Sequence, residues 1–546
     1  MKWYAFREAT VGTLSQFAMF ILVAAQGVPL DTSSITGIVS RSGTAEPLDL
    51  AVVSLIPAGG AAAPPSVETD STGRFSFRNV PPGRYAIRVR REGYFGPLRH
   101  GTSAAFVTWQ ITLTGQQSIP DLQFNMFPGA SVSGRIFDER GVPVPGAQVH
   151  ALRITYDRGR RFLSPIPRRA DERGEYRLFS LPPGQYYIRA DVAPGGVATG
   201  SDGMSRTTYF PNAADLDTAQ PVVLTAGAER TALDIGLRAT AAATIKGKVI
   251  NNLSDYKNQS VGFTLVPHDP HIPIDNLPSP AGRKFNPETG DFELFGVRPG
   301  SYELVASANN SRGVVGEGHV PVDVGGGEVN GVTVAIFPSV DVKVHLVMEG
   351  GAAIDTRTLE FFLDQRESGT LRLRPSQAID SNGVVTFSNV PPSMWSPMIL
   401  GPYPDAYVSD VRQRGKSVFN DGQVRVEGEP ESVDLIIQPK GPAIDGSVRG
   451  AAGSGIETAR VVLVPQPPRR KNVLLYQVTN PDAAGHFTFT GVAPGQYKIF
   501  AWESVPTNAW ENAEFMAPFE GFGRPISIAG GDVANITVDL IGENQR

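Results

Sequence analysis

The sequence predicts an all-β protein, a tandem array of about five β-sandwich or barrel domains that follow an N-terminal signal peptide. Three observations predict this fold class. A stretch that reads as strand, proline–glycine corner and strand occurs five times in the 546 residues. Several short segments alternate apolar and polar residues, which is the pattern of half-buried strands. The 59 glycines and 45 prolines exceed the usual share, as expected for many short strands joined by turns.

Length and composition limit the alternatives. A chain of 546 residues is too long for one hydrophobic core, and its length predicts about three to five domains. A net charge of −5 gives no basic field for nucleic acid, so we expect no nucleic-acid partner. The sequence contains no cysteine, which excludes disulfides, cysteine nucleophiles and thiolate metal sites, so each domain must be held by its own core.

The N-terminus has the pattern of a signal peptide. Lys2 and Arg7 precede an apolar run, Phe17–Ala25, and small residues suited to cleavage follow it, so we expect residues 1–27 to be removed. The alternative is an uncleaved anchor, but the run is shorter than the ~20 residues that span a bilayer. A lipid anchor would need a cysteine at the cleavage site. The mature chain is therefore expected in the periplasm, at the cell surface or in the medium, without a membrane span.

The repeated stretch sets the expected domain boundaries. Its copies lie about a hundred residues apart, a domain-sized period, and they occupy Thr72–Val89, Asp171–Arg189, Thr289–Val305, Asn382–Trp395 and Gly485–Phe500. After the signal peptide, we predict five sandwiches over residues 30–128, 129–239, 240–338, 339–440 and 441–546. Each should open with a short strand such as Ser34–Val39 and close with an alternating strand such as Ile536–Leu540.

Each recurring position in the stretch has a structural role. Asp70 and Gly73 suit a hairpin turn, because aspartate caps the turn and glycine takes a left-handed backbone. Phe75 and Phe77 lie two residues apart and therefore share one face of the strand. The prolines that follow cannot donate ladder hydrogen bonds, so strand pairing stops there.

The fourth predicted domain is the degenerate copy. Ser393 replaces the corner glycine and Trp395 replaces the tyrosine of the other copies, so we expect a distorted corner. The opening strand of this domain, Val340–Leu346, also lacks the glycine that the other four opening strands carry.

These motifs resemble a known family. The series Gly-x-Val, Pro-Gly-Ala-x-Val, Asp-x-x-Gly-x-Phe-x-Phe and Leu-Pro-Pro-Gly-x-Tyr is similar to the carboxypeptidase regulatory-like domain, over nearly the whole mature chain. The resemblance implies seven-stranded prealbumin-like or Ig-like β-sandwiches, of a carbohydrate-binding-like fold related to Cna-B type surface repeats. Two segments, Thr208–Asn212 and Phe515–Gly523, resemble loops of exported multi-repeat proteins of Acidobacteria. A shared fold does not imply a shared function.

The sequence shows no recognisable catalytic centre. Zinc carboxypeptidases need a His-x-x-Glu pair and further ligands, and none of the seven histidines has a glutamate three residues later. His268 and His271 form a histidine cluster that we interpret as part of a proline-rich loop. Lys246 could form an isopeptide cross-link of the Cna-B kind, but the closing strand offers no inward asparagine, so a surface lysine is expected. We predict no enzyme activity, metal or cofactor.

Aromatic residues near connecting segments are the candidate ligand-binding residues. Sugar rings stack on flat aromatic faces, and the candidates for such stacking are Trp109, Tyr209, Phe210, Trp502 and Trp510. The alternative is that these rings cover strand ends. Basic clusters at 158–161, 168–169 and 469–471 could bind anionic glycans or lipid headgroups, or form solvated faces.

The predicted function is that of an exported, non-enzymatic protein that binds or scaffolds outside the cytoplasm. Polysaccharide or cell-envelope components are the expected partners. A purely structural or adhesive spacer at the cell surface is one alternative, and an accessory protein of a carboxypeptidase-type peptidase is another. Short junctions such as Gln438–Pro442 predict little freedom between neighbouring domains, as in a rod. The oligomeric state does not follow from the sequence.

Overall fold

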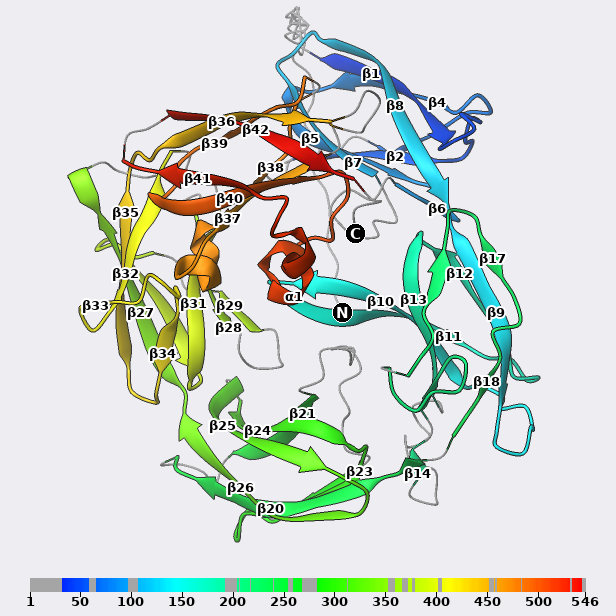
Figure 1. Ribbon diagram of the computed structural model, residues 1–546, viewed down its shortest axis with the longest axis vertical. Helices are drawn as coiled ribbons and strands as arrows, with labels where there is room; N and C mark the ends of the chain where they lie inside the picture. Colours follow the sequence, from blue (N-terminus) through cyan, green and yellow to red (C-terminus); the bar gives the residue numbers. More distant parts are fainter. Residues whose placement is uncertain are drawn as a thin grey trace, which may run out of the picture. The chain divides into compact units, whose positions relative to one another are not determined.

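The computed structural model shows a chain that is almost entirely β, which confirms the predicted fold class (Figure 1). It describes residues 32–57, 65–96, 107–191, 204–205, 207–216, 218–238, 240–253, 259–267, 282–311, 313–351, 359–365, 372–375, 379–400, 405–450, 456, 459–482, 484–530 and 533–542. The predicted signal peptide and the histidine pair His268 and His271 lie outside these residues. No helix in the described ranges is both long and apolar enough to cross a membrane.

The chain forms two compact units. The first comprises Pro47–Arg88, Thr108–Gln123 and the described part of Met1–Val39, and the second comprises the remainder. Five successive sets of strands, called repeats 1 to 5 below, carry the five copies of the repeated stretch. The boundaries of five separate domains stay a prediction.

Repeat 1 pairs its strands in two sheets. Its strands are β1 (Ser33–Arg41), β2 (Val52–Pro57), β3 (Val67–Glu68), β4 (Arg74–Val80), β5 (Gly83–Arg90), β6 (Tyr94–Phe95), β7 (Val107–Leu113) and β8 (Ser118–Pro128). One sheet has the order β4-β1-β8-β6 and the other has the order β3-β2-β5-β7. Alternate residues of these strands point inward, and Ile35, Phe75, Phe77 and Ile87 are buried.

Repeat 2 is also a two-sheet sandwich. Its strands are β9 (Ala130–Phe137), β10 (Gln148–Asp157), β11 (Arg160–Arg169), β12 (Glu175–Leu181), β13 (Gly184–Asp191), β14 (Met204–Ser205), β15 (Thr207–Tyr209), β16 (Val222–Leu224), β17 (Glu229–Arg230), β18 (Ile235–Gly236) and β19 (Thr240–Ala241). The sheets have the orders β11-β10-β13-β15 and β12-β9-β17, and β10 and β11 form a long hairpin (Figure 1).

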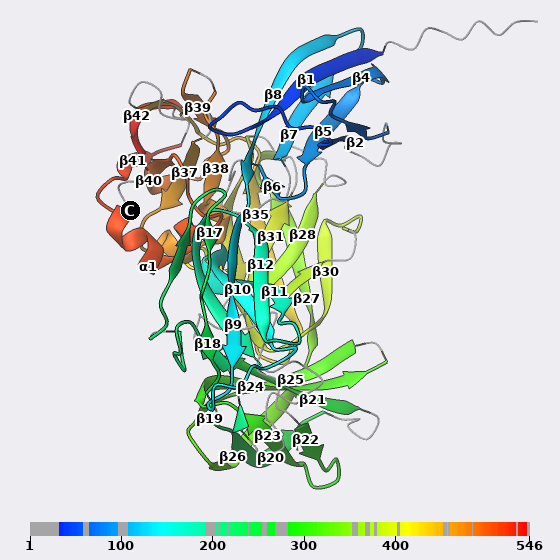
Figure 2. The same cartoon turned by 90° about the vertical axis from the view of Figure 1, so that its right-hand side faces the viewer.

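Repeat 3 joins its strands along one hydrogen-bonded path. Its strands are β20 (Ala243–Asn251), β21 (Ser260–Pro267), β22 (Gly282–Phe285), β23 (Asp291–Val297), β24 (Gly300–Asn310), β25 (Gly313–Val324) and β26 (Glu328–Pro338). The order is β21-β24-β25-β26-β20-β23-β22, and Figure 2 shows β20 and β26 side by side in green.

Repeat 4 returns to two sheets. Its strands are β27 (Val340–Met348), β28 (Glu360–Gln365), β29 (Arg372–Pro375), β30 (Val384–Val390), β31 (Ser393–Leu400), β32 (Tyr407–Gln413), β33 (Lys416–Ser417), β34 (Val424–Val426) and β35 (Glu431–Gln438), and the short 3₁₀ helix η3 (Glu349–Gly351) follows β27. The sheets have the orders β30-β27-β35-β32-β33 and β29-β28-β31-β34.

Repeat 5 contains short helical segments in addition to its strands. Its strands are β36 (Ala443–Arg449), β37 (Arg460–Pro465), β38 (Gln477–Thr479), β39 (His486–Phe489), β40 (Gly495–Trp502), β41 (Arg524–Ile528) and β42 (Val533–Ile541). Its helices are η6 (Arg469–Lys471), η7 (Val473–Leu475), η8 (Ala509–Glu511), α1 (Ala513–Met516) and η9 (Ala517–Phe519). The segment between β40 and β41, residues 503–523, is called the insert.

The same pairing scheme recurs along the chain. In every repeat the opening strand pairs antiparallel with the strand that precedes the corner, as in β1 with β4 and β36 with β39. In repeats 2 to 5 the closing strand or strands pair parallel with the opening strand, as in β26 with β20 and β42 with β36. The recurrence of sequence is therefore a recurrence of strand topology.

The opening-strand glycine is opposite an aromatic ring in four repeats. The register partners are Gly37 and Phe75, Gly134 and Tyr176, Gly247 and Phe292, and Gly446 and Phe487. A Cβ on Gly446 would lie 2.3 Å from the Phe487 ring and 2.8 Å from the Ile536 carbonyl. Repeat 4 places Val344 opposite Val385 at this position. Its missing glycine is thus matched by a missing ring.

The corner is held by a hydrogen bond from the core aromatic. The Tyr85 hydroxyl donates to the carbonyl of Pro81 at 3.0 Å, and Tyr497 donates to Ala493 at 2.7 Å. In repeat 4 the indole N–H of Trp395 donates to the carbonyl of Pro391 at 3.0 Å. Repeat 4 therefore keeps this hydrogen bond, because the indole N–H donates in place of the phenol O–H, and the predicted distortion of the corner stays a prediction.

The Asp-x-x-Gly turns form as predicted. Asp70 Oδ1 accepts from the backbone N–H groups of Thr72 and Arg74 at 2.8 and 3.0 Å. Gly73 has a φ of +72°, a conformation that glycine adopts without strain. In the described copies, the repeated stretch therefore serves to form the turn, the paired strands and the corner.

Candidate functional site

The predicted ligand-binding aromatics lie in three places. Trp502 and Trp510 are only 1% and 3% exposed in repeat 5, and Tyr209 is 7% exposed in repeat 2. Phe210 packs, partly buried, against the repeat 2 core. Trp109 is in β7, and its side chain is outside the described part of the structure. The burial of Trp502, Trp510 and Tyr209 fits the alternative, rings that cover strands, and ligand binding by these residues stays a prediction.

The insert buries the two tryptophans. Five rings, called the aromatic cap, gather on the outer face of β37 and β40: Phe500, Trp502, Trp510, Phe515 and Phe519. Phe500 and Trp502 stack with centroids 5.1 Å apart and planes 8° apart, and the Phe519 ring meets Trp502 edge-on at 5.8 Å. The flat faces that a sugar would need are therefore occupied by protein rings.

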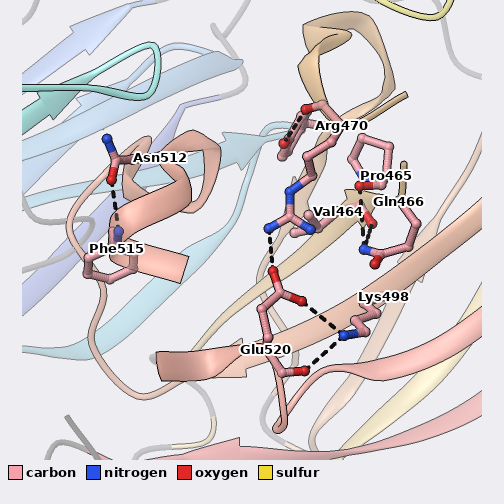
Figure 3. Close-up of polar contacts among 9 residues, drawn as sticks. Val464, Pro465, Gln466, Arg470, Lys498, Asn512, Phe515 and Glu520 are labelled. Carbon is pink, nitrogen blue, oxygen red and sulfur yellow. Dashed lines mark hydrogen bonds and ion pairs between the residues drawn. The ribbon is translucent and has the colours of Figure 1, made fainter. Parts of the chain in front are cut away.

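Ion pairs fasten the insert to the sheet (Figure 3). The carboxylate of Glu520 accepts from Arg470 at 2.7 Å and from Lys498 at 2.9 Å. Burial opposes ionisation of Glu520, but Lys498 and Arg470 outweigh it and lower the pKa of this carboxyl. Asn512 caps α1 by accepting from the N–H of Phe515 at 2.8 Å. One arginine of the basic cluster 469–471 thus serves an internal contact.

The β10–β11 hairpin of repeat 2 reaches the same insert. Its tip, residues 156–161, is called the basic finger because it carries three arginines. The Tyr156 ring lies 5.5 Å from Phe515, and the carbonyl of Gly159 accepts from Asn512 Nδ2 at 2.9 Å. Gly159 has a φ of +74°, and a Cβ there would lie 2.8 Å from Glu511. Close approach to repeat 5 therefore requires this glycine.

Arginines of the basic finger meet carboxylates from other repeats. Arg158 pairs with Asp364 of repeat 4 at 3.1 Å, and the Asp364 side chain is fully buried. Burial and the neighbouring Arg158 lower the pKa of Arg160, while the charges of Asp157, Asp364 and Glu303 oppose this shift. Glu303 belongs to β24 of repeat 3.

The basic finger of repeat 2 therefore contacts repeats 4 and 5. In a rod of beads only neighbours would touch, and the contacts of Gly159 with Asn512 and of Arg158 with Asp364 contradict that expectation. Figure 1 shows β10 and β11 running toward α1. The arginines at 158–161 are thus part of an internal junction.

A second polar group lies on the outer face of the β10–β13 sheet. We call it the Arg189 cluster, and it consists of His150, Arg189, Asp191, Thr207 and Arg298. His150, Arg189 and Tyr209 form one row across β10, β13 and β15. Asp191 accepts from Arg189 Nε at 2.7 Å and from the Thr207 hydroxyl at 2.6 Å.

Repeat 3 contributes the second arginine of this cluster. Arg298 precedes the corner proline and donates to Thr207 Oγ1 at 2.9 Å. Burial opposes ionisation of Asp191, but the charges of Arg189 and Arg298 outweigh it and lower the pKa of this carboxyl. Burial and the charge of Arg189 lower the pKa of His150 to about 4, so its ring is neutral at pH 7.

Sequence reasoning predicted none of the five residues of the Arg189 cluster. A usable signal was present: the residue before the corner proline is proline in repeats 1, 2 and 4 and alanine in repeat 5, but it is Arg298 in repeat 3. No sequence signal marked Asp364, the partner of Arg158 in the basic finger, because it looks like an ordinary strand residue.

Lys246 is 40% exposed and pairs with Glu328 at 2.6 Å, in line with the expected surface lysine.

The described residues include no group of three histidine, aspartate or glutamate side chains placed to hold a metal ion. Two shallow grooves, of about 610 and 480 Å³, lie over the opening-strand glycines Gly134 and Gly446. Their walls combine exposed residues such as Thr537 with buried aromatic residues, Tyr176 in one groove and Phe487 in the other. In the groove over Gly446, the Ser447 hydroxyl lies 3.3 Å from the Thr537 hydroxyl, and the His486 ring lies 3.7 Å from Asp482.

Comparison with known proteins supports the family resemblance in repeat 1. Residues 34–102 match the family model of the carboxypeptidase regulatory-like domain. The resemblance stated from the motifs is confirmed there. No curated protein matches the chain.

Solved structures that match the chain include two bacterial pilins. The TIE protein of Bacillus anthracis is 10% identical, with 84% of this chain and 71% of that chain covered and a TM-score of 0.15. A streptococcal ancillary pilin is 12% identical, with 55% and 98% covered and a TM-score of 0.17. The minor pilin GBS52 of Streptococcus agalactiae is 12% identical, with 38% and 97% covered and a TM-score of 0.22. At these TM-scores no functional inference follows.

Proposed function

We propose that the chain is an exported, non-enzymatic structural protein that holds β-sandwich surfaces in a fixed relation outside the cytoplasm. The basic finger is the observation that supports this role. It inserts between repeats that are far apart in sequence and contacts them through buried charges, hydrogen bonds and rings. A protein whose task is mechanical benefits from such cross-links, because they oppose the rotation of one repeat against another.

The energetics of the finger support a structural role. Removing one partner from a buried ion pair typically costs about 3–5 kcal/mol, and Asp364, the partner of Arg158, is fully buried. The ring contact between Tyr156 and Phe515 adds to this in a region shielded from water. The basic finger therefore stabilises the contacts between repeats, although its sequence looks like a ligand-binding patch.

Export is supported by the sequence and by how the repeats are held. Residues 1–27 have the charge and apolar pattern of a signal peptide. Repeats 2 and 3 each have a core of buried apolar residues, and repeats 4 and 5 share one, so no disulfide is needed for stability. A role at the cell surface or in the periplasm fits both observations.

Carbohydrate binding through the five candidate aromatics stays a prediction that the observed burial does not favour. Sugar stacking on Trp502 or Trp510 would require the insert to leave β40. An accessory role beside a carboxypeptidase-type peptidase has no supporting contact in the described residues. The structural role is therefore preferred to both.

A complementation experiment tests the proposal. In a deletion strain of the producing organism, we expect envelope integrity or surface adhesion to fall, and the full chain to restore it. A chain without residues 1–27 should fail to restore it, and fractionation should place the full chain outside the cytoplasm. The variant Arg158→Gln should restore it poorly, whereas the exposed control Arg169→Gln should act as wild type. Full rescue by the unexported chain would contradict the proposal.

A further inference from the structure

The Arg189 cluster contains buried nitrogen atoms without hydrogen-bond partners. The Arg189 side chain is 1% exposed, and its Nε donates to Asp191. Its Nη2 atom is buried and has no hydrogen-bond partner. Both ring nitrogens of His150, which is 5% exposed, also lack hydrogen-bond partners, although Nε2 lies 3.4 Å from Asp191. Buried donors of this kind are nearly always satisfied in folded proteins, so an unassigned partner is expected.

The charges of the cluster do not balance. Arg189 and Arg298 each carry a positive charge, and Asp191 carries the negative charge that pairs with Arg189. His150 is neutral at pH 7. The five named residues therefore carry one more positive than negative charge, with Arg189 almost completely buried and Arg298 partly buried. A buried charge is costly unless an opposite charge or several hydrogen bonds compensate for it.

We propose that the Arg189 cluster is a binding site for a small oxyanion, a carboxylate or a phosphate, at the junction of repeats 2 and 3. Arg189 Nη2 donates to the anion, and neutral His150 supplies one N–H group. Arg298 provides the second positive charge from repeat 3. Guanidinium groups suit this ligand class, because their planar N–H donors match the oxygens of carboxylates and phosphates.

The charges of the Arg189 cluster favour a bound anion over a bound water. A water would satisfy the donors but would leave the extra positive charge uncompensated. The site also explains Arg298, which stands where the other repeats have proline or alanine. Occupancy would link repeats 2 and 3 through one ligand. This inference does not depend on the proposed structural role.

Anion-dependent stability of the full chain tests the site. We expect the unfolding temperature to rise with sodium phosphate or sodium acetate, relative to sodium chloride at equal ionic strength, as for any ligand of the folded state. A response to only one of the two anions supports the site and assigns its ligand class. In NMR titrations the imidazole signal of His150, assigned with His150→Gln, should shift with the same dissociation constant.

Arg298→Gln is the informative variant, because Arg298 is only partly buried whereas replacement of Arg189 is expected to unfold the repeat. It should bind the active anion at least tenfold more weakly. The control is Arg177→Gln, an exposed arginine of repeat 2 that pairs with Glu229, and it should bind as wild type. Equal responses to chloride, phosphate and acetate would overturn the proposal. So would equal affinity in Arg298→Gln and wild type, or a crystal structure grown in the anion that raises the unfolding temperature with only water on Arg189 Nη2.

Discussion

At the scale of single residues, a pair of facing core residues keeps a similar total volume when both residues differ between repeats. Four repeats place a glycine opposite an aromatic residue, and repeat 4 places Val344 opposite Val385. A core position accepts a larger side chain only if a neighbour becomes smaller, because protein interiors are close-packed. Repeat 4 is therefore a repacked copy, and its departure from the motif does not by itself weaken its core.

The glycine–ring pair gives a double-mutant prediction in repeat 5. Gly446→Val should destabilise the protein by about 1–3 kcal/mol, because its side chain would overlap the Phe487 ring. Phe487→Val should cost a similar amount by leaving a cavity. The double variant, which has the pair found in repeat 4, should be more stable than the sum of the two changes predicts, by about 1 kcal/mol or more.

Urea unfolding of the four proteins measures this coupling. Gly521→Ala is the matched control, since a Cβ at Gly521 meets no atom within 4 Å. Strictly additive losses in the double variant would show that the glycine serves the approach of the Ile536 carbonyl alone.

His319 gives a pH prediction. Burial opposes its charged form, but Glu303 and Glu317 outweigh burial and raise the pKa of His319 to about 9. The imidazole nitrogens lie 3.5 Å from Glu303 and 3.7 Å from Glu317. Because the folded-state pKa exceeds the unfolded value, the stabilisation is complete below about pH 6.5 and is lost as the pH rises through 9.

Unfolding free energies between pH 6 and 10 check this expectation. The contribution of His319 should decline by about 3 kcal/mol over that range. His319→Gln should be less stable than wild type at pH 6, and the difference should shrink toward pH 10. His486→Gln, at an exposed position, is the control. A difference that stays constant with pH would contradict the assignment of charge to His319.

At the scale of elements, local sequence motifs could be predicted, whereas strand faces covered by distant segments of the chain could not. The Asp-x-x-Gly turn and the two-residue spacing of Phe75 and Phe77 depend on neighbours in sequence, so both could be predicted. The burial of Trp502 depends on an insert that packs on the second face of β40. A signal existed, because Ile499–Trp502 is continuously apolar, a pattern of strands buried on both faces. The basic finger gave no such signal, since its partners lie about 200 to 350 residues away.

The corner hydrogen bond, made by a tyrosine hydroxyl in repeat 5 and by a tryptophan N–H in repeat 4, gives a stability prediction. Tyr497→Phe should cost about 1–2 kcal/mol, because it leaves the buried carbonyl of Ala493 without its donor. Trp395→Phe should cost more, because it removes the same kind of donor and also leaves a cavity where the larger ring was. Chemical unfolding measures both, with Tyr94→Phe outside the corners as control. A neutral Tyr497→Phe would show that the hydroxyl bond contributes little to the corner.

At the scale of the whole molecule, the second compact unit is more than a series of independent sandwiches. Buried side chains of repeats 4 and 5 form one continuous core, from Val340 to Val538. The Asn472 side chain of repeat 5, fully buried, donates to the carbonyl of Phe419 in repeat 4. The basic finger adds contacts with repeats 4 and 5 from repeat 2. Contacts of this kind couple the stabilities of the repeats that they join.

Coupling predicts that repeats 2 to 5 unfold in fewer transitions than their number, and that the finger is responsible for part of this. Arg158→Gln removes the arginine that pairs with the buried Asp364, and adding Asn512→Ala removes the hydrogen bond to Gly159. We expect calorimetry of this double variant to show a new transition at lower temperature, with a loss of about 3 kcal/mol in the affected part. Arg169→Gln, at an exposed position on the same hairpin, should leave the wild-type profile unchanged. If wild type and double variant unfold through the same separate transitions, the finger is a contact without mechanical consequence, and the structural role proposed for it fails.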